Sequence, residues 1–175
     1  MLHLNFIPFP NLYTERLCLR QLGMKDENEV FLLRSDETVN KYLNRQPAKS
    51  IEDARRHIQR LNDGFANKES IIWAITEKNN DTLIGSICFW KISPDEAKAE
   101  IGYELLPIHQ GKGIMQEALS PVIQYGIEKM KLKSIEAELS PQNIKSIKLL
   151  ESNGFTLLID NTDEDSIVYV LMNKA

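Results

Sequence analysis

The sequence predicts one mixed-sheet α+β or α/β layer domain across residues 1–175. Three observations predict this class. Several short runs alternate apolar and polar residues, as strands with one buried face do. The runs in the middle of the chain are separated by short turns, which indicates antiparallel neighbours. After them the order becomes helix, strand, helix, strand, strand, which is typical of a sheet of mixed direction.

The first part of the chain predicts one strand followed by helices. Alternating residues indicate a strand over roughly 14–22. A short helix is expected over Glu27–Arg34. It should turn three apolar side chains inward, those of Val30, Leu32 and Leu33. Asp36–Leu43 is expected to add a further helical turn.

A longer helix is predicted by its capping residues. Ser50 is followed three residues later by Asp53, which is typical of a helix N-cap with an acidic first turn. Apolar residues at helical spacing then continue to about Ala66. Together these features predict a helix over 51–66.

The middle of the chain predicts three consecutive strands. Two strand-like runs cover Ile71–Ile75 and Leu83–Ile92. The polar stretch between them, Lys78–Asp81, is typical of a tight turn, so the two runs predict a β-hairpin. A second turn, Ser93–Asp95, leads into a third strand over about 97–106.

A loop with two glycines, Gly111-Lys112-Gly113, joins this third strand to a helix predicted from Gly113 to about Met130. Unsatisfied N–H groups at a helix start, together with the helix dipole, favour an anion such as phosphate. Two glycines around a lysine also occur in ordinary turns, so the loop alone does not show whether it binds a phosphate. Pro121 lies inside the predicted helix and lacks an N–H, which predicts a kink or a broken hydrogen bond.

The C-terminal part predicts strands around one helix. A strand is expected over Ser134–Leu139, followed by a helix over Asn143–Ser152 that ends at Gly154. The candidate core residues of this helix are Ile144, Ile147, Leu149 and Leu150. The last expected elements are two strands and the acidic turn between them, over Phe155–Ile159, Ile167–Met172 and 160–165.

Composition and charge exclude several classes of protein. The net charge of −4 argues against a nucleic-acid partner, because phosphate binding needs basic surface. Cys18 and Cys88 lack metal-ligand spacing and fit buried free thiols in a reducing compartment. No apolar run approaches the roughly 20 residues that span a bilayer, and the N-terminus has no signal-peptide pattern. We expect a cytoplasmic enzyme or binding module with no metal site and no membrane partner.

Short motifs along the chain resemble those of a known family. They are Thr14-Glu15-Arg16-Leu17-x-Leu19-Arg20, Trp73-Ala74-Ile75, Leu83-Ile84-Gly85-Ser86-Ile87, Ala99-Glu100-Ile101-Gly102-Tyr103, Gln110-Gly111-Lys112-Gly113 with Glu117-Ala118-Leu119, and Asn143-x-x-Ser146 with Asn153-Gly154-Phe155. In this order they resemble the GNAT acyltransferases, which use acetyl-CoA, and are similar to the branch with the ribosomal-protein N-terminal acetyltransferases. The resemblance covers nearly the whole chain. It implies a mostly antiparallel sheet with helices on both faces and strands that splay at the centre.

The resemblance implies a site for coenzyme A. The family's loop pattern, Gln/Arg-x-x-Gly-x-Gly/Ala, corresponds here to Gln110–Met115, so Met115 replaces a small residue and must point away from the phosphates. The diphosphate-binding residues would be Gln110, Gly111, Lys112, Gly113, Ile114 and Met115. Lys112 either adds charge at the rim or is simply solvated. In the family the strand over 97–106 carries a bulge and parts from its parallel neighbour, here 134–140, and amides near Leu105 and Leu106 would bind the pantetheine arm.

Amine acetylation needs a base for the amine proton and a donor for the leaving thiolate. Glu100 and Glu104 lie four apart on one strand and share a face, and Glu100 matches the position that the family often uses near the acceptor amine. Either is a candidate base, or a solvated carboxylate. Many relatives carry a tyrosine at the position of Leu150, so Ser146 is the candidate acid, or a helix-surface serine. Asn143 binds the pantetheine or caps its helix.

Three aromatic residues have open roles. Tyr103 lines the acceptor tunnel or belongs to the core, and Trp73 and Trp90 are core residues or walls of the acceptor pocket.

The resemblance implies an acetyl-CoA-dependent N-acetyltransferase that moves an acetyl group to a primary amine by direct attack. The acceptor would be a protein N-terminus, such as that of a ribosomal protein, or a small amine. The alternative is a catalytically weak CoA-binding regulatory module. A mononucleotide-binding fold is disfavoured, because its glycine loop would follow the first strand. Either a monomer or a homodimer fits the sequence.

Overall fold

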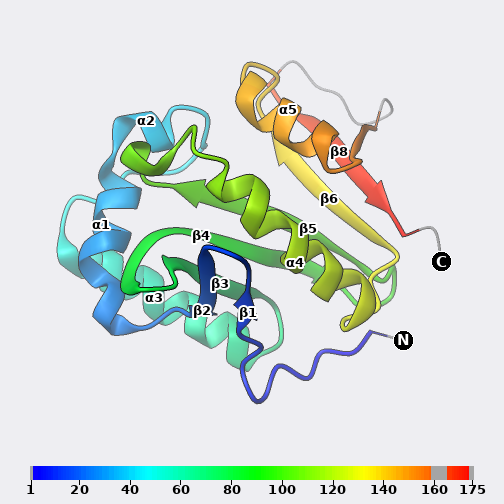
Figure 1. The fold of residues 1–175 in the computed structure, drawn as a ribbon, viewed down its shortest axis with the longest axis horizontal. Coiled ribbons are helices and arrows are strands. Elements are labelled where there is room, and N and C mark those ends of the chain that lie inside the picture. The colour runs from blue at the N-terminus through cyan, green and yellow to red at the C-terminus, as the bar shows by residue number, and fades with distance from the viewer. Residues whose placement is uncertain (1, 159–164, 174–175) are drawn as a thin grey trace.

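The computed structural model describes residues 2–158 and 165–173 (Figure 1). Its strands are Leu12–Tyr13 (β1), Leu17–Gln21 (β2), Ile71–Glu77 (β3), Asn80–Ser93 (β4), Lys98–Leu105 (β5), Ser134–Leu139 (β6), Thr156–Leu157 (β7) and Ile167–Met172 (β8). Its α-helices are Glu27–Ser35 (α1), Glu37–Asn40 (α2), Ile51–Ala66 (α3), Ile114–Glu128 (α4) and Ile144–Ser152 (α5). The strands form one sheet in the order β1-β2-β3-β4-β5-β6-β8-β7. Of these neighbours β5 and β6 are parallel and the others antiparallel, so the predicted mixed, mostly antiparallel sheet is confirmed.

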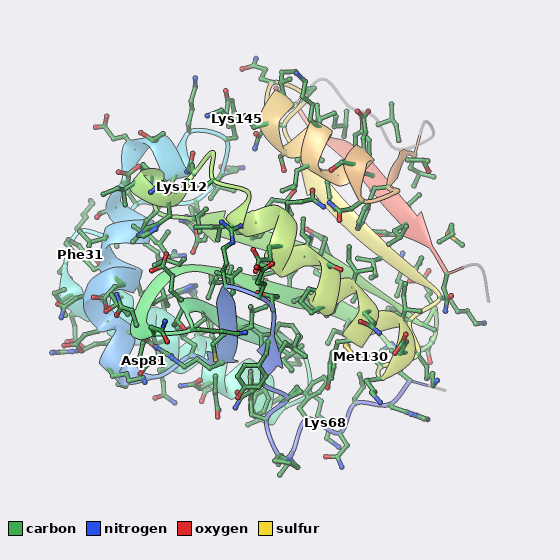
Figure 2. All side chains as sticks on the ribbon, viewed as in Figure 1. Phe31, Lys68, Asp81, Lys112, Met130 and Lys145 are labelled. Atoms are coloured by element: carbon green, nitrogen blue, oxygen red, sulfur yellow. The ribbon has the colours of Figure 1, made fainter. Side chains whose placement is uncertain are left out.

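Helices cover both faces of the sheet, as expected. Successive residues of a strand point to opposite faces, and in β3 the side chains of Trp73 and Ala74 enter two different cores. The larger core contains residues of α4 and α5, and the smaller one contains residues of α1 and α3. Figure 1 shows α4 and α5 on the viewer's side of the sheet and α3 behind it. In Figure 2, Lys112 and Met130 mark the two ends of the α4 region.

The capping signal at Ser50 is confirmed. The Ser50 side chain accepts a hydrogen bond from the Asp53 N–H, and the Asp53 carboxylate accepts one from the Ser50 N–H. The helix that follows, α3, has the predicted bounds. The strand predicted over 134–139 is β6 and has the predicted bounds, because the alternation of its residues and the turns on either side indicate the same ends.

Two predicted core positions are wrong, and one predicted segment cannot be compared. Leu32 in α1 and Ile144 in α5 are exposed by 51% and 53%, because each helix turns its neighbouring apolar residues to the sheet instead. The helix α4 ends at Glu128, and the buried Met130 follows in a turn. The acidic turn over 160–165 and the end of the strand at Ile159 lie largely outside the described residues.

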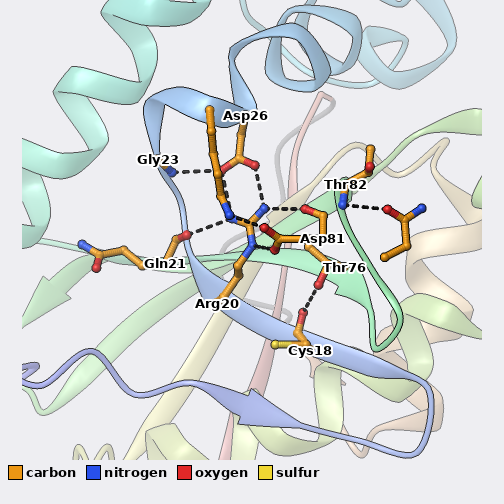
Figure 3. A network of polar contacts seen from close by, with 10 residues as sticks. Cys18, Arg20, Gln21, Gly23, Asp26, Thr76, Asp81 and Thr82 are labelled. Carbon is orange, nitrogen blue, oxygen red and sulfur yellow. Dashed lines mark hydrogen bonds and ion pairs between the residues drawn. The ribbon is translucent and has the colours of Figure 1, made fainter.

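A network of ion pairs joins the start of α1 to the β3–β4 turn (Figure 3). The Arg20 guanidinium contacts both oxygens of the buried Asp26 carboxylate, at 2.7 and 2.9 Å, and also pairs with Asp81. Asp26 in turn accepts a hydrogen bond of 2.9 Å from the Gly23 N–H. This bidentate pairing fixes α1 against the sheet.

The parallel pair at the centre of the sheet is short, and this opens the sheet. Residues Lys98–Glu100 of β5 pair with Ser134–Glu136 of β6, and beyond Glu100 the two strands part. Figure 1 shows β6 diverging from β5 along the rest of its length. The expected splay is therefore present. The irregularity expected in β5 lies instead in β4, where the register with β5 shifts between Trp90 and Ser93.

Replacing Gly85 with Ala is expected to destabilise the protein. A Cβ atom at Gly85 would lie 2.5 Å from the Glu104 carbonyl oxygen in β5, so the strands must shift, at about 1–3 kcal/mol. Chemical denaturation measures the loss. Gly23→Ala is the matched control, since a Cβ at Gly23 meets nothing within 4 Å. Equal unfolding free energies for the two variants would contradict the close packing at Gly85.

Candidate active site

A run of free backbone N–H groups marks the start of α4. After β5 the chain makes a 3-10 turn over Pro107–His109 and reaches α4 through Gly111 and Gly113, whose φ angles are +75° and +73°. Glycine adopts this left-handed conformation without strain. Within the part of the chain that the structure describes, the N–H groups of residues 111–116 donate to no protein acceptor. With the helix dipole behind them, this arrangement is typical of helix starts that bind an anion.

The side chains of this loop divide into those that face solvent and those that anchor it. The Gln110 Nε2 atom donates to the Leu105 carbonyl oxygen at 3.0 Å and so ties the loop to the end of β5. Ile114 and Met115 are buried in the larger core, so Met115 points away from the loop surface, as its position requires. The Lys112 side chain is exposed.

A three-residue contact, the Arg16 latch (Thr14, Arg16 and Glu117), holds an arginine against this loop. The Glu117 carboxylate accepts hydrogen bonds from the Thr14 hydroxyl at 2.5 Å, the Arg16 N–H at 2.8 Å and the Arg16 Nε at 2.6 Å. The Arg16 Nη1 also donates to the Lys112 carbonyl oxygen at 3.1 Å. The guanidinium thus lies beside the free N–H groups. Sequence reasoning missed it, because Arg16 and Glu117 are 101 positions apart and nothing local signals their pairing.

Glu117→Gln is expected to lower the melting temperature at pH 7, because it removes a charged acceptor of hydrogen bonds worth about 2 kcal/mol. Burial opposes ionisation of Glu117, but hydrogen bonds from Thr14 and Arg16 outweigh it and hold its pKa below the ordinary value. A lowered folded pKa stabilises the protein above the unfolded value of about 4.3 and loses that effect as the pH falls through the folded pKa.

Calorimetry of the wild type and the Glu117→Gln variant between pH 7 and pH 3 measures this difference. The gap in melting temperature should be full at pH 7 and should close below about pH 4.3. Glu128→Gln, at the exposed end of the same helix, is the control. A gap that does not change with pH would contradict the role given to the Glu117 carboxylate.

The edge of β5 presents free backbone groups to the gap between β5 and β6. The Leu106 N–H donates to the Ile84 carbonyl oxygen of β4 at 2.9 Å. Hydrogen-bonding direction alternates along an antiparallel strand, so the backbone groups of Leu105 and Tyr103 point the other way, into the gap. The Leu105 carbonyl oxygen already accepts from Gln110, which leaves the Leu105 N–H and the backbone groups of Tyr103. Because the Leu106 N–H is used within the sheet, we expect the amide contact from Leu105 rather than from Leu106.

A hydroxyl pair spans this gap. The Tyr103 hydroxyl of β5 lies 2.5 Å from the Ser146 Oγ on the first turn of α5. Burial raises the pKa of Tyr103 to about 12, although the bond to Ser146 lowers it. Tyr103 is thus a neutral hydrogen-bonding partner of Ser146, a role that neither of its two sequence interpretations foresaw.

Asn143 caps α5 and keeps a free donor. Its Oδ1 atom accepts from the Ser146 N–H at 3.2 Å, so the capping interpretation is confirmed. Within the described residues its Nδ2 donates to no protein acceptor, which leaves it available to a ligand.

The two candidate carboxylates share one face of β5 but differ in their partners. Glu100 lies at the fork of the sheet and contacts Lys91 Nζ at 2.8 Å. Its burial, helped by the carboxylates of Glu138 and Glu136, raises its pKa above the ordinary value, although Lys91 opposes this. Glu104 is held by the Arg45 guanidinium at 2.7 Å. Glu100 is therefore the better poised base, because a raised pKa brings a carboxylate nearer to the working pH.

Comparison with known proteins decides the family. Residues 16–156 match the family described as "Acetyltransferase (GNAT) domain". The chain is 42% identical over 148 residues to the uncharacterized N-acetyltransferase p20 of Bacillus licheniformis, covering 82% of this chain and 81% of that protein. The chain belongs to the GNAT acetyltransferase family.

Solved structures of GNAT acetyltransferases have the same fold. RimL, an alpha-N-protein acetyltransferase of a ribosomal protein solved in complex with coenzyme A, superposes with a TM-score of 0.81 at 20% identity, over 93% of this chain and 98% of RimL. MccE, a microcin self immunity acetyltransferase in complex with acetyl-CoA and AMP, gives a TM-score of 0.78 at 25% identity, over 91% and 94% of the two chains.

One of the two tryptophans lies exposed beside the fork of the sheet. Trp90 in β4 lies directly across from Glu100 in β5, and the Lys91 ammonium lies 4.6 Å from the centre of its ring. Trp73, in contrast, is fully buried, and its Nε1 donates to the Pro10 carbonyl oxygen at 2.8 Å. The two tryptophans thus divide into one surface residue near the fork and one core residue.

The Cys88 thiol is poorly suited to act as a nucleophile at this GNAT site. Cys88 pairs in register with Gly102 of β5, and burial raises the pKa of its thiol to about 12. A thiol that stays protonated attacks a thioester poorly.

Among the described residues there is also no group of three or more His, Cys, Asp or Glu side chains that could hold a metal ion. No helix in the described ranges has the length and apolar character to cross a bilayer.

Proposed function

We propose that this GNAT acetyltransferase transfers the acetyl group of acetyl-CoA to a primary amine by direct attack. One observation carries the proposal: the free N–H groups of residues 111–116 lie at the end of the same strand, β5, whose edge opens into the gap beside β6. A diphosphate at the loop would let the pantetheine arm enter that gap. The structures of RimL with coenzyme A and MccE with acetyl-CoA support this choice of donor.

The arm would pair with β5 as an added strand does. The Leu105 N–H and the backbone groups of Tyr103 face the gap, and a pantetheine amide can bond to them in the place of the missing β6 neighbour. An N–H of the same edge then polarises the thioester carbonyl. The Asn143 Nδ2 supplies a further donor from the opposite side of the gap.

The reaction moves protons on both sides of one bond exchange. Glu100, directly or through water, accepts a proton from the ammonium form of the acceptor. The free amine attacks the thioester carbon, a C–N bond forms, and the C–S bond breaks. Ser146 gives its proton to the departing thiolate. It regains a proton from solvent or from the Tyr103 hydroxyl, which it already contacts. The second proton of the attacking nitrogen leaves to solvent.

The acceptor proposed is a protein N-terminus, such as that of a ribosomal protein, or a small amine. RimL acts on a ribosomal protein, which supports the first choice. The two free cysteines fit a reducing compartment, and we place the enzyme in the cytoplasm. The proposal treats residues 1–175 as one catalytic unit, acting as a monomer or a homodimer.

Release of free thiol from acetyl-CoA tests the proposal. Acceptors would include ribosomal-protein N-terminal peptides, polyamines, aminoglycosides and amino acids, and calorimetry would measure binding of coenzyme A in parallel. We expect heat with coenzyme A and amine-dependent thiol release. Heat without thiol release across the panel would favour the CoA-binding regulatory module instead. No heat would overturn the proposal.

A further inference from the structure

Two arginines from different helices meet at one histidine. Arg34, in α1, places its Nη1 3.3 Å from the His57 Nε2, and Arg60, in α3, places its Nη2 3.0 Å from the His57 Nδ1. We call Arg34, His57 and Arg60 the Arg-His-Arg cluster. Arg34 and His57 are half-buried, whereas Arg60 is exposed.

The cluster has more hydrogen-bond donors than acceptors. A guanidinium can only donate, and a neutral imidazole has one accepting nitrogen. His57 can therefore accept from one arginine, and its second ring nitrogen turns an N–H toward the other. Burial and the charges of Arg34, Arg60 and Arg45 lower the pKa of His57 to about 3, so the imidazole is neutral at pH 7.

Neither arginine of the cluster has a carboxylate partner. Within the described residues, no carboxylate oxygen lies within 4.0 Å of the Arg34 or Arg60 guanidinium. The other arginines of the chain are all paired with an acid, as Arg20 is in Figure 3. A half-buried, unpaired guanidinium is costly to keep, and a bound anion would remove that cost.

Arg45 connects the cluster to the strand that carries both candidate bases. The Arg45 guanidinium, whose charge acts on both Arg34 and His57, pairs with Glu104 at 2.7 Å. Glu104 shares its face of β5 with Glu100, four residues away, which is about 13 Å along a strand. This pairing also cancels the charge of Glu104, the acid with the larger charge effect on Arg34. The remaining local charge is positive.

We propose that Arg34 and Arg60 bind an anionic group, a carboxylate or a phosphate, carried by the acceptor itself, so that the enzyme selects amines that also carry an acidic group. This rests on the proposed function for the amine and the acetyl donor. The net charge of −4 alone would favour cationic acceptors, whereas the uncompensated arginines favour the opposite choice. The Asp53 carboxylate, the other acid in electrostatic reach of Arg34, is already paired with Arg56.

A binding measurement tests the cluster without turnover. The imidazole signal of His57, assigned with His57→Gln, is followed by NMR as inorganic phosphate is added to protein saturated with coenzyme A, which occupies the loop at residues 111–116. We expect a saturable shift of His57 and a rise in its pKa. R34Q/R60Q should weaken phosphate about tenfold or more, the loss for a charged hydrogen bond.

The control and a second variant keep this measurement decisive. Arg55→Gln removes a neighbouring arginine of α3 that is paired with Glu27 and Glu52, and it should leave phosphate binding unchanged. Arg60→Gln alone changes only an exposed side chain and serves if the double variant fails to fold. An absence of any His57 shift, or equal shifts in wild type and Arg60→Gln, would overturn the proposal.

Matched acceptors then test selection during turnover. The pairs are the peptides Ser-Ala-Ala-Glu-Phe and Ser-Ala-Ala-Gln-Phe, and Ser-Ala-Ala-Ser-Phe with and without a phosphate on its second serine, so that carboxylate and phosphate are compared separately. The acid then stands three residues from the amine, about 10 Å along an extended chain before the side chain is added. We expect kcat/KM to favour the anionic member of at least one pair by about tenfold, and R34Q/R60Q to abolish this preference. A wild-type preference for the uncharged members would overturn the acidic-acceptor proposal while thiol release leaves the acetyltransferase proposal standing. If coenzyme A does not bind, the proposed function fails, and the phosphate titration of the free protein still tests the cluster.

Discussion

Glu100→Gln is expected to lower kcat about a hundredfold while the dissociation constant of coenzyme A changes little. The variant removes the proposed acceptor for the proton of the ammonium group, whereas the loop at residues 111–116 that would hold the diphosphate is untouched. Steady-state kinetics at saturating acetyl-CoA, with calorimetry of coenzyme A binding, measures both quantities.

The pH dependence of the wild type reports on the same group. Because burial raises the pKa of Glu100, the basic form accumulates only above this raised value, and kcat/KM should climb with pH through it. The stability effect has the opposite sign: a raised folded pKa stabilises below the unfolded value of about 4.3 and loses this as the pH rises. At neutral pH, loss of the Glu100 carboxyl should therefore not lower the melting temperature of Glu100→Gln below that of the wild type.

Glu136→Gln is the matched control for Glu100. Glu136 lies directly beside Glu100 on β6, and its charge contributes to the raised pKa. Its removal should move the rising limb of the pH profile to lower pH and leave the plateau rate unchanged. Full activity of Glu100→Gln between pH 6 and pH 9 would show that another group, such as Glu104 or a water chain, removes the proton.

Ser146→Ala is expected to lower kcat about tenfold to a hundredfold, since the thiolate then leaves without a proton donor at its side. Tyr103→Phe should lower kcat less, because it removes only the 2.5 Å contact to Ser146 and keeps the serine hydroxyl in the gap. With the pKa of Tyr103 raised to about 12, neither variant should alter the pH profile between pH 6 and pH 9.

Single-turnover measurements of acetyl transfer separate this step from product release. Ser152→Ala, on the last turn of α5, is the matched control, because Ser152 bonds to Gln116 and Leu149 away from Tyr103. An unchanged rate for Ser146→Ala would remove Ser146 from the chemistry and leave solvent as the proton donor.

Sequence reasoning recovered the features that local patterns determine. Ser50 and Asp53 are three positions apart, so their capping box could be predicted together with the helix that it starts. The positions of Leu32 and Ile144 were wrong, because adjacent apolar residues leave the rotation of a short helix undetermined and packing on the sheet decides it. The used N–H of Leu106 depends on the register of β4 and β5, which no single strand reveals.

The site was predictable as a list of positions but not as a set of contacts. Glu100, Glu104 and Ser146 come from motifs, whereas the Tyr103–Ser146 pair joins residues 43 positions apart and the Arg16 latch spans 101. The Arg-His-Arg cluster has no sequence signal either, since it exists only where α1 packs on α3. Side-chain partners across the fold follow from tertiary packing, which periodicity does not encode.

The short pairing of β5 with β6 has a mechanical consequence. Three residue pairs form the whole ladder between the block β1–β5 and the block of β6, β7 and β8. A ligand bound in the opening would supply hydrogen bonds that β5 and β6 lack there. Acetyl-CoA would then hold the two parts of the sheet together as well as donate its acetyl group. We expect bound acetyl-CoA to slow amide exchange along both margins of the opening and to make these margins more resistant to proteases.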